Sequence, residues 1–195
     1  MIDLLRRVRR TPDRLLHPLR RRKAIEALRG RQRPNTVLVV CHGNICRSPM
    51  AAALLARELA PLSITVHSAG LIGFNRPAPA EAIGAATRHG LDLAAHRSRP
   101  VTVEAVRTAD LIVVMEWSQK RLLCERYGCA SRDVMVLGDF DPQPEGRTIR
   151  DPFEQGRDVF DQVYERIARC VRQVGAILKT SDVRFPPAAS HTPSL

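Results

Sequence analysis

Short apolar runs rich in β-branched residues alternate along this chain with longer stretches in which apolar residues recur every three or four positions. The short runs are typical of buried strands and the longer stretches of amphipathic helices. Strands that alternate with helices predict an α/β fold with a four-stranded parallel doubly wound sheet and helices on both faces. We expect strands at residues 36–40, 62–66, 111–115 and 134–137, and helices at about 49–59, 80–89, 101–108, 118–127 and 154–179.

Changes in composition divide the chain into three parts. Residues 36–180 carry the alternating pattern and should form a single domain, whose last helix presents a regularly spaced apolar face to the core. Within this domain, residues 138–152 hold three prolines and two glycines, which predicts a surface loop. Residues 181–195 are rich in proline and serine and are expected to be a disordered tail.

The N-terminal extension, residues 1–35, carries most of the charge. It holds twelve Lys or Arg and three Asp or Glu, and therefore +9 of the formal net charge of +11. Its arginine clusters alternate with small apolar groups, and prolines interrupt the pattern, so we expect two or three short basic amphipathic helices. Such helices suit an anionic membrane surface or a partner protein, and a solvated, partly disordered tail is the alternative. Nucleic acid is a weak candidate, because no aromatic residue is available for base stacking.

Cysteine usage and hydropathy narrow the class of protein. The five cysteines are an odd number and follow no secretory signal, so they indicate cytosolic thiols rather than a disulfide framework. None of them has zinc-ligand spacing, so no metal is assigned. No apolar run approaches the length of about 18 residues that spans a membrane. We expect a cytoplasmic protein, and the basic extension suggests a membrane-peripheral position as an alternative.

The stretch from Cys41 to Ser48 lies between the first expected strand and the first expected helix of the domain. Gly43 and Asn44 favour a tight turn, so backbone N–H groups can converge there as an anion site. Arg47 adds a planar fork suited to a phosphate group. A cysteine in such a site should have a depressed pKa, and Ser48 can donate a hydrogen bond to its sulfur. A thiolate beside a phosphate cradle predicts phosphoryl transfer through a phosphocysteine.

This reaction needs a general acid that protonates the leaving oxygen and then activates water. Asp151 is our candidate, because Pro152 fixes the backbone behind it and Phe153 offers a surface for an aromatic substrate. An Asp-Pro pair in a loop is more often simple turn chemistry. The assignment of Asp151 therefore depends on a family resemblance.

The sequence Cys-His-Gly-Asn-Ile-Cys-Arg-Ser-Pro-Met-Ala that begins at Cys41 resembles the signature loop of the low-molecular-weight protein tyrosine phosphatases. Residues 36–179 follow that family from end to end, including Ser68-Ala69-Gly70, the segment 90–99 and Asp151-Pro152-Phe153. The resemblance implies that Cys41 is the nucleophile, Arg47 the phosphate binder and Asp151 the general acid, with no metal or other cofactor.

The resemblance also implies supporting roles. Cys46 matches a second loop cysteine that can trap oxidised Cys41 as a reversible disulfide, a role that suits the neighbour of an exposed, low-pKa thiol. The other members of the phosphate loop and its hydrogen-bonding support are His42, Gly43, Asn44, Ile45, Ser48, Ser68 and His96.

Aromatic residues are expected to form the substrate wall. By resemblance, Phe74 is one wall residue and Phe153 is the first of two aromatic positions after the acid, but Glu154 replaces the second. An acidic wall would disfavour anionic peptides. Trp117, which begins the helix after the third strand, is expected to be a packing anchor.

Other functions on this scaffold remain open. Protein arginine phosphatases tend to carry threonine where Ile45 stands, which favours phosphotyrosine here, but their acid is also followed by phenylalanine, as in this chain. Arsenate reductases need two cysteines just beyond the third strand, whereas Cys124 and Cys129 come about a helix too late and are expected to be core thiols. A non-catalytic phospho-binding or scaffold protein that acts through the extension would need neither a thiolate nor an acid.

The sequence therefore predicts a protein-tyrosine phosphatase that hydrolyses phosphotyrosine through a phosphocysteine intermediate, with a protein arginine phosphatase as the first alternative. The expected partner is a phosphotyrosine protein. In a bacterial setting, family habit makes an autophosphorylating tyrosine kinase the candidate.

Overall fold

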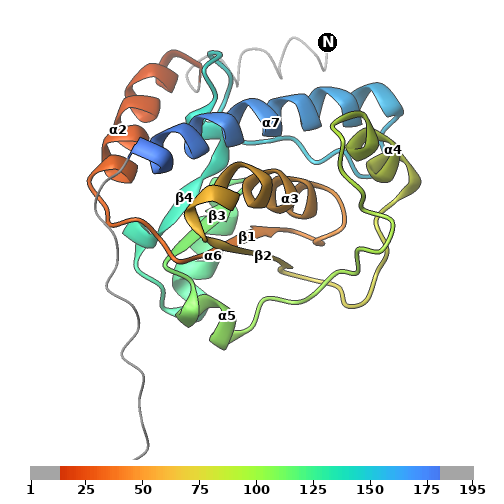
Figure 1. Cartoon of the computed structure of the whole chain (residues 1–195), viewed down its shortest axis with the longest axis horizontal. Coiled ribbons are helices and arrows are strands. Elements are labelled where there is room, and N and C mark those ends of the chain that lie inside the picture. Colours follow the sequence, from red (N-terminus) through yellow and green to blue (C-terminus); the bar gives the residue numbers. More distant parts are fainter. Residues whose placement is uncertain (1–13, 181–195) are drawn as a thin grey trace, which may run out of the picture.

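A four-stranded parallel sheet forms the centre of the computed structural model, which describes residues 14–180 (Figure 1). The strands lie in the order β2-β1-β3-β4, and Val40 of β1 pairs with Ala69 on one side and with Val114 on the other. Successive connections run from β1 to one edge and then across to the other edge, which confirms the predicted doubly wound α/β fold. The strands are β1 (Thr36–Cys41), β2 (Thr65–Gly70), β3 (Leu111–Val114) and β4 (Val134–Val136).

Helices cover both faces of the sheet. Alternate side chains of β1 enter two separate apolar cores: Val37 and Val39 pack with α3 and α7, and Leu38 and Val40 pack with α5 and α6. Both faces are therefore buried, which explains the uninterrupted apolar strands. The helices within residues 14–180 are α2 (His17–Arg29), α3 (Arg47–Leu59), α4 (Ala80–Arg88), α5 (Val103–Thr108), α6 (Trp117–Tyr127) and α7 (Arg157–Thr180), with 3-10 turns η1 (Ala60–Leu62), η2 (Ser131–Asp133) and η3 (Leu137–Phe140).

Two predicted boundaries are wrong for backbone reasons. The second strand begins at Thr65 rather than at residue 62, because η1 extends α3 and Ser63 then adopts a left-handed φ of 56°. The last helix begins at Arg157 rather than at Glu154, since Glu154 has a φ of 58°, which an α-helix cannot contain.

The prediction of a surface loop at 138–152 is wrong for the first part of that segment. Phe140 is 1% exposed and Asp141 is fully buried. The Asp141 carboxylate can be buried because ion pairs with arginines of α7 replace its hydration. Gly138 serves close packing rather than a turn, since a Cβ there would lie 2.1 Å from the carbonyl oxygen of Arg147. The glycine and the charges mark a buried polar junction.

The described part of the basic extension contains the helix α2. The expected number of two or three helices over residues 1–35 stays a prediction, because residues 1–13 lie outside the described residues. Pro18 lies in the first turn of α2, where proline is tolerated, and the helix ends before Gly30. Leu28 is 3% exposed within the core, and the guanidinium of Arg21 donates a hydrogen bond to Gln173 of α7 at 3.0 Å. Figure 1 shows α2 beside the C-terminal end of α7. This part of the extension therefore packs on the domain.

The proposed division of the chain at residue 36 stays a prediction, as does the disordered tail at 181–195, which lies outside the described residues together with residues 1–13. Among the described helices, none combines the length and the apolar character that crossing a bilayer requires.

The topology places Cys41 at a privileged position. It is the last residue of β1, and the strand order reverses between β1 and β3. Ligands of doubly wound sheets bind beyond the carboxyl ends of strands at such a reversal.

Candidate active site

The loop that follows β1 is built around Asn44. This residue is fully buried and has a left-handed φ of 51°, a conformation that costs a non-glycine residue about 1–2 kcal/mol. Its side-chain amide donates to Ser48 Oγ at 2.8 Å and to Ser68 Oγ at 3.0 Å, and its Oδ1 accepts the backbone N–H of Arg99 at 2.9 Å. His96 Nε2 lies 2.7 Å from its carbonyl oxygen. Four hydrogen bonds thus hold the strained turn in place.

Gly70 allows β2 to approach this loop. A Cβ on Gly70 would lie 2.9 Å from the backbone nitrogen of Asn44 and 2.9 Å from the carbonyl carbon of Gly43. Any other residue would push the loop away from the strand. The Ser68-Ala69-Gly70 motif therefore contributes both a hydroxyl partner and the space for close contact.

The sulfur of Cys41 is surrounded by hydrogen-bond donors. It lies 3.0 Å from Ser48 Oγ and accepts the backbone N–H of Asn44 at 3.3 Å. Because the Asn44 amide already donates to Ser48 Oγ, the Ser48 hydroxyl hydrogen is left to donate to the sulfur or to the carbonyl of Ala69 at 3.3 Å. This arrangement suits an anionic sulfur, which can only accept.

Arg47 is a buried cation at the start of α3, 1% exposed. Its Nη1 donates to Glu116 Oε1 at 2.6 Å and to the carbonyl of Ile149 at 3.2 Å, and its Nη2 pairs with Asp151 Oδ2. Its Nε is buried and has no acceptor among the residues that the structure describes. An oxyanion in the loop would supply that acceptor.

Glu116 is the site residue that the sequence reasoning missed. It follows β3, whose Val114 pairs with Val40 of β1, one residue before Cys41. Parallel strands present their carboxyl ends at one edge, so a carboxylate just after the neighbouring strand was the available signal.

Asp151 is positioned by Arg47 rather than by Cys41. Its Oδ1 accepts the backbone N–H of Phe153 at 3.2 Å, and its side chain is 41% exposed. A phosphate bound to Arg47 competes with the Asp151 carboxylate for the same guanidinium. Phosphate binding would therefore free Asp151 to reach the leaving oxygen.

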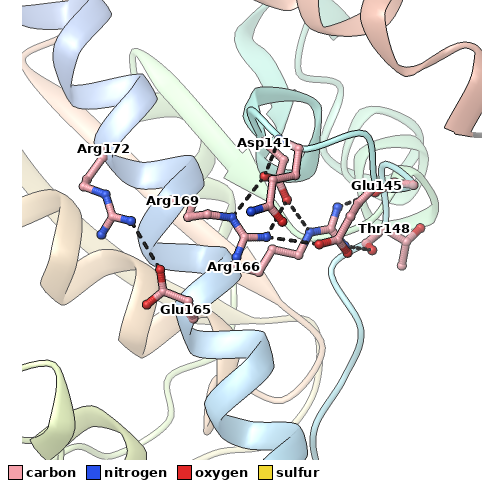
Figure 2. A network of polar contacts seen from close by, with 9 residues as sticks. Asp141, Glu145, Thr148, Glu165, Arg166, Arg169 and Arg172 are labelled. Atoms are coloured by element: carbon pink, nitrogen blue, oxygen red, sulfur yellow. Dashed lines mark hydrogen bonds and ion pairs between the residues drawn. The ribbon is translucent and has the colours of Figure 1, made fainter.

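A network of buried charges anchors the segment that leads to Asp151. Figure 2 shows Arg166 and Arg169 of α7 reaching across to this segment. Arg166 Nε donates to Asp141 Oδ2 at 2.9 Å and its Nη1 to the carbonyl of Thr148 at 2.8 Å, while Arg169 Nη2 donates to Glu145 Oε1 at 3.0 Å. These bonds hold the segment that leads to Asp151 against α7.

Cys46 lies in the same loop and is buried. Burial raises the pKa of the Cys46 thiol to about 12, and the negative charges of Asp151 and Cys41 add to this effect. Cys46 is thus a neutral thiol near neutral pH. The hydroxyl of Tyr164 donates to its carbonyl oxygen at 3.0 Å and ties the loop to α7. The role of Cys46 in trapping oxidised Cys41 stays a prediction.

The residues expected to form the substrate wall lie at the surface. Phe74 is 75% exposed and Phe153 39% exposed, and Glu154 is exposed in its left-handed conformation. The guanidinium of Arg76 lies 5.6 Å from the centre of the Phe153 ring, so this wall carries a cation as well as the carboxylate of Glu154.

A cavity of about 260 Å³ adjoins Arg47 and Asp151, and neither Phe74 nor Phe153 is among its lining residues. The lining residues are His42, Arg47, Leu71, Glu116, Ser118, Gln119, Leu122 and Asp151.

Cys124 and Cys129 lie at the margin of the core, where they pack against the cluster that includes Leu38 and Val40. Both cysteines are only partly buried, and their sulfur atoms lie 3.9 Å apart at the end of α6. Within residues 14–180, no three His, Cys, Asp or Glu side chains are grouped so as to hold a metal ion.

Comparisons with known proteins agree with this geometry. A family model described as low molecular weight phosphotyrosine protein phosphatase matches residues 36–183. The probable low molecular weight protein-tyrosine-phosphatase EpsP of Ralstonia nicotianae is 38% identical over 136 residues, which are 70% of this chain and 90% of that protein.

Two solved structures share the fold. The tyrosine phosphatase Wzb from Escherichia coli K30, in complex with sulphate, has a TM-score of 0.68 at 32% identity and covers 74% of this chain and 99% of its own. The YwlE arginine phosphatase from Geobacillus stearothermophilus also has a TM-score of 0.68, at 30% identity, and covers 75% and 94%.

We expect Glu116→Ala to lower kcat/KM for an aryl phosphate about tenfold or more, because Arg47 Nη1 then loses its carboxylate partner and the guanidinium loses its fixed position. Glu116→Gln keeps an acceptor oxygen and should recover most of the loss. The measurement is steady-state kinetics of both variants, with Glu125→Ala as the matched control, since Glu125 forms an exposed pair with Arg121 on the same helix. Unchanged kinetics in Glu116→Ala would show that Arg47 needs no support from β3.

Proposed function

This chain belongs to the low molecular weight phosphotyrosine protein phosphatase family, and we propose that it hydrolyses phosphotyrosine in proteins through a phosphocysteine intermediate. The contact between Cys41 Sγ and Ser48 Oγ at 3.0 Å, inside a loop that also holds the buried Arg47, carries this proposal. A phospho-binding protein would use the cation and the backbone N–H groups, but it would have no need of a sulfur aligned with a hydroxyl donor.

The first step transfers the phosphoryl group to the sulfur. The substrate phosphate binds the loop N–H groups and Arg47, which releases Asp151 from the guanidinium. Once it has left the guanidinium, the Asp151 carboxylate takes up a proton from solvent. The Cys41 thiolate then attacks phosphorus as the bond to the tyrosine oxygen breaks, and Asp151 gives that oxygen its proton.

The second step returns the enzyme to its starting state. Asp151, now ionised, takes a proton from a water molecule that attacks the phosphocysteine. The bond between sulfur and phosphorus breaks, and the thiolate is stabilised by the Ser48 hydroxyl and the Asn44 N–H. Inorganic phosphate then leaves, and Asp151 releases its proton to solvent and pairs with Arg47 again.

Phosphotyrosine is the preferred substrate over phosphoarginine in this proposal. Ile45 is 5% exposed within the loop and offers no hydroxyl group, and Arg76 already places a guanidinium against Phe153. A second guanidinium at this wall would meet a like charge, whereas a phenyl ring would not. The likeness to an arginine phosphatase structure keeps the alternative in view.

The proposed partner is a phosphotyrosine protein, with a bacterial tyrosine kinase as the candidate. Support comes from the relatives named as protein-tyrosine phosphatases, such as EpsP of Ralstonia nicotianae.

The basic extension is proposed to contact an anionic membrane surface. Leu15 and Leu16, just before α2, are 74% and 51% exposed, and Leu19 in its first turn is 50% exposed. Exposed arginines such as Arg14 and Arg22 lie near them in the chain. Exposed leucines among cations are the composition that binds the headgroup region of anionic lipids.

A side-by-side turnover test on phosphotyrosine and phosphoarginine peptides of the same sequence decides the substrate class. We expect kcat/KM to be at least about tenfold higher for phosphotyrosine, because only the phenyl ring suits the Phe153 wall with its cation. Cys41→Ser should abolish both activities while phosphate still binds. Full activity in Cys41→Ser would overturn the cysteine mechanism, and a preference for phosphoarginine would assign the chain to the alternative.

Asp151→Asn tests the general acid through a series of aryl phosphates with different leaving groups. The loss in kcat/KM should grow from severalfold for a good leaving group to about 10²–10⁴-fold for a poor one, because only the poor one needs its proton in the transition state. Asp161→Asn is the control, as this carboxylate pairs with Arg88 and Arg157 rather than with Arg47. An equal loss across the series would exclude Asp151 as the acid.

For the membrane proposal, the double variant Leu15→Ser, Leu19→Ser should reduce sedimentation with phosphatidylserine vesicles at least about tenfold, since each leucine loses apolar contact with lipid. Val103→Ser, which changes an exposed apolar residue on α5, is the control. Turnover of a small aryl phosphate should be unchanged in both the double variant and the control. If the full chain binds phosphatidylserine vesicles no better than neutral ones, the membrane contact is excluded.

A further inference from the structure

A second cavity, of about 250 Å³, lies between α2 and the β4 edge of the sheet. It shares no lining residue with the cavity at Arg47 and Asp151. Its apolar surface includes Ala27 and Leu28 of α2, Met135 of β4 and Trp117 of α6. Ligand pockets commonly have volumes of about 300–1,000 Å³, so a space of this size suits a small molecule rather than a peptide.

The charge around this cavity is strongly unbalanced. Only one carboxylate, that of Asp139, is among the lining residues, and it already pairs with Arg20 and Arg147. The lining cations come from α2, the segment after it, α6, η2 and the segment before Asp151: they are Arg20, Lys23, Arg31, Lys120, Arg132 and Arg147. Two of these cations, Lys23 and Arg132, are exposed, and the other four are partly buried. An excess of cations around a cavity favours an anionic occupant.

Several of these cations retain capacity for an anion. The Lys23 ammonium and the Arg132 guanidinium have no hydrogen-bond or ion-pair partner within the described part of the chain. Lys120 donates to the carbonyls of Ser131 and Val134 at 2.7 and 2.6 Å. These acceptors are neutral and do not balance the ammonium charge, and burial lowers the pKa of Lys120. An anion near these groups would restore part of the solvation that the fold removes.

Trp117 gives the cavity a flat aromatic wall. The sequence led us to expect a packing anchor, but the side chain is 42% exposed. The Arg147 guanidinium lies 4.5 Å and the Lys120 ammonium 5.5 Å from its ring. A planar guanidinium stacked on an indole offers a surface on which a further aromatic ring can stack.

We propose that this cavity binds a small phosphorylated aromatic molecule of the nucleoside monophosphate class. The phosphate group contacts Lys23 and Arg132, and the ring system lies against the wall of Trp117 and Arg147. The apolar floor excludes a free inorganic ion as the preferred ligand, because such an ion would leave that surface in contact with water.

Trp117 is the only tryptophan of the chain, so its fluorescence reports directly on the cavity. Titration of the full chain with AMP should change this fluorescence in a saturable way. Adenosine and inorganic phosphate, which each lack half of the recognised chemistry, should bind at least about tenfold more weakly than AMP.

Charge reversal at the rim locates the ligand. Lys23→Glu and Arg132→Glu should each raise the Kd for AMP about tenfold or more, because an attractive contact becomes a repulsive one. Arg22→Glu and Arg107→Glu are matched controls, since both residues are exposed and neither lines this cavity. Thermal melting of each variant shows whether the fold is retained, and kcat/KM for a small aryl phosphate should be unchanged in all four.

Three outcomes overturn the proposal. One is the absence of any saturable change with AMP. Another is an affinity for AMP that is equal in Lys23→Glu and Arg22→Glu, which would place the ligand elsewhere. The third is inorganic phosphate binding as tightly as AMP, which would leave the aromatic wall without a role.

Discussion

A single buried guanidinium joins the three segments from which the active site is made. Arg47 belongs to the loop after β1, Glu116 follows β3, and Asp151 ends a long segment after β4, and the two carboxylates meet on this one cation. A cation that is 1% exposed must have such partners, because burying it alone would cost far more than the fold can offset. The need to satisfy Arg47 thus brings the nucleophile's loop and the acid's segment together before any substrate arrives.

The fold could be predicted from the sequence because its main determinant is apolar periodicity. The continuous apolar runs of β1 and β3 reflect burial on both faces of the sheet, and the spacing along α7 reflects one buried helix face. The errors occurred where buried polar groups or backbone strain decide the structure. Asp141 and its partner Arg166 look like surface charges in the sequence, and nothing local shows that α7 will enclose them. The left-handed Glu154 that delays α7 gives no composition signal either.

The site residues likewise fall into those that local sequence predicts and those that only the folded structure brings together. Residues within one short loop were accessible to sequence reasoning, since Cys41, Asn44 and Ser48 are neighbours in the chain and their chemistry follows from their spacing. Glu116 and Arg76 reach the site from elsewhere, and only strand order and side-chain direction place them. The extension was expected to form basic amphipathic helices, but the sequence does not show that Leu28 anchors α2 in the core of the domain.

The cavity between α2 and the β4 edge of the sheet is connected to Arg47 through the chain. Two residues of its wall, Trp117 and Arg147, lie close in the chain to acceptors of Arg47. Trp117 directly follows Glu116, and Arg147 precedes Ile149 by two residues. Both Glu116 and the carbonyl of Ile149 accept hydrogen bonds from Arg47. A ligand in this cavity changes the position of Arg47 only if it binds two arrangements of Trp117 and Arg147 with different affinities. Phosphate at Arg47 would then change the cavity's affinity by the same factor. A tenfold coupling corresponds to about 1.4 kcal/mol, which is about the net value of one charge-assisted hydrogen bond. The gain or loss of the bond between Glu116 and Arg47 would therefore be sufficient to couple the two sites.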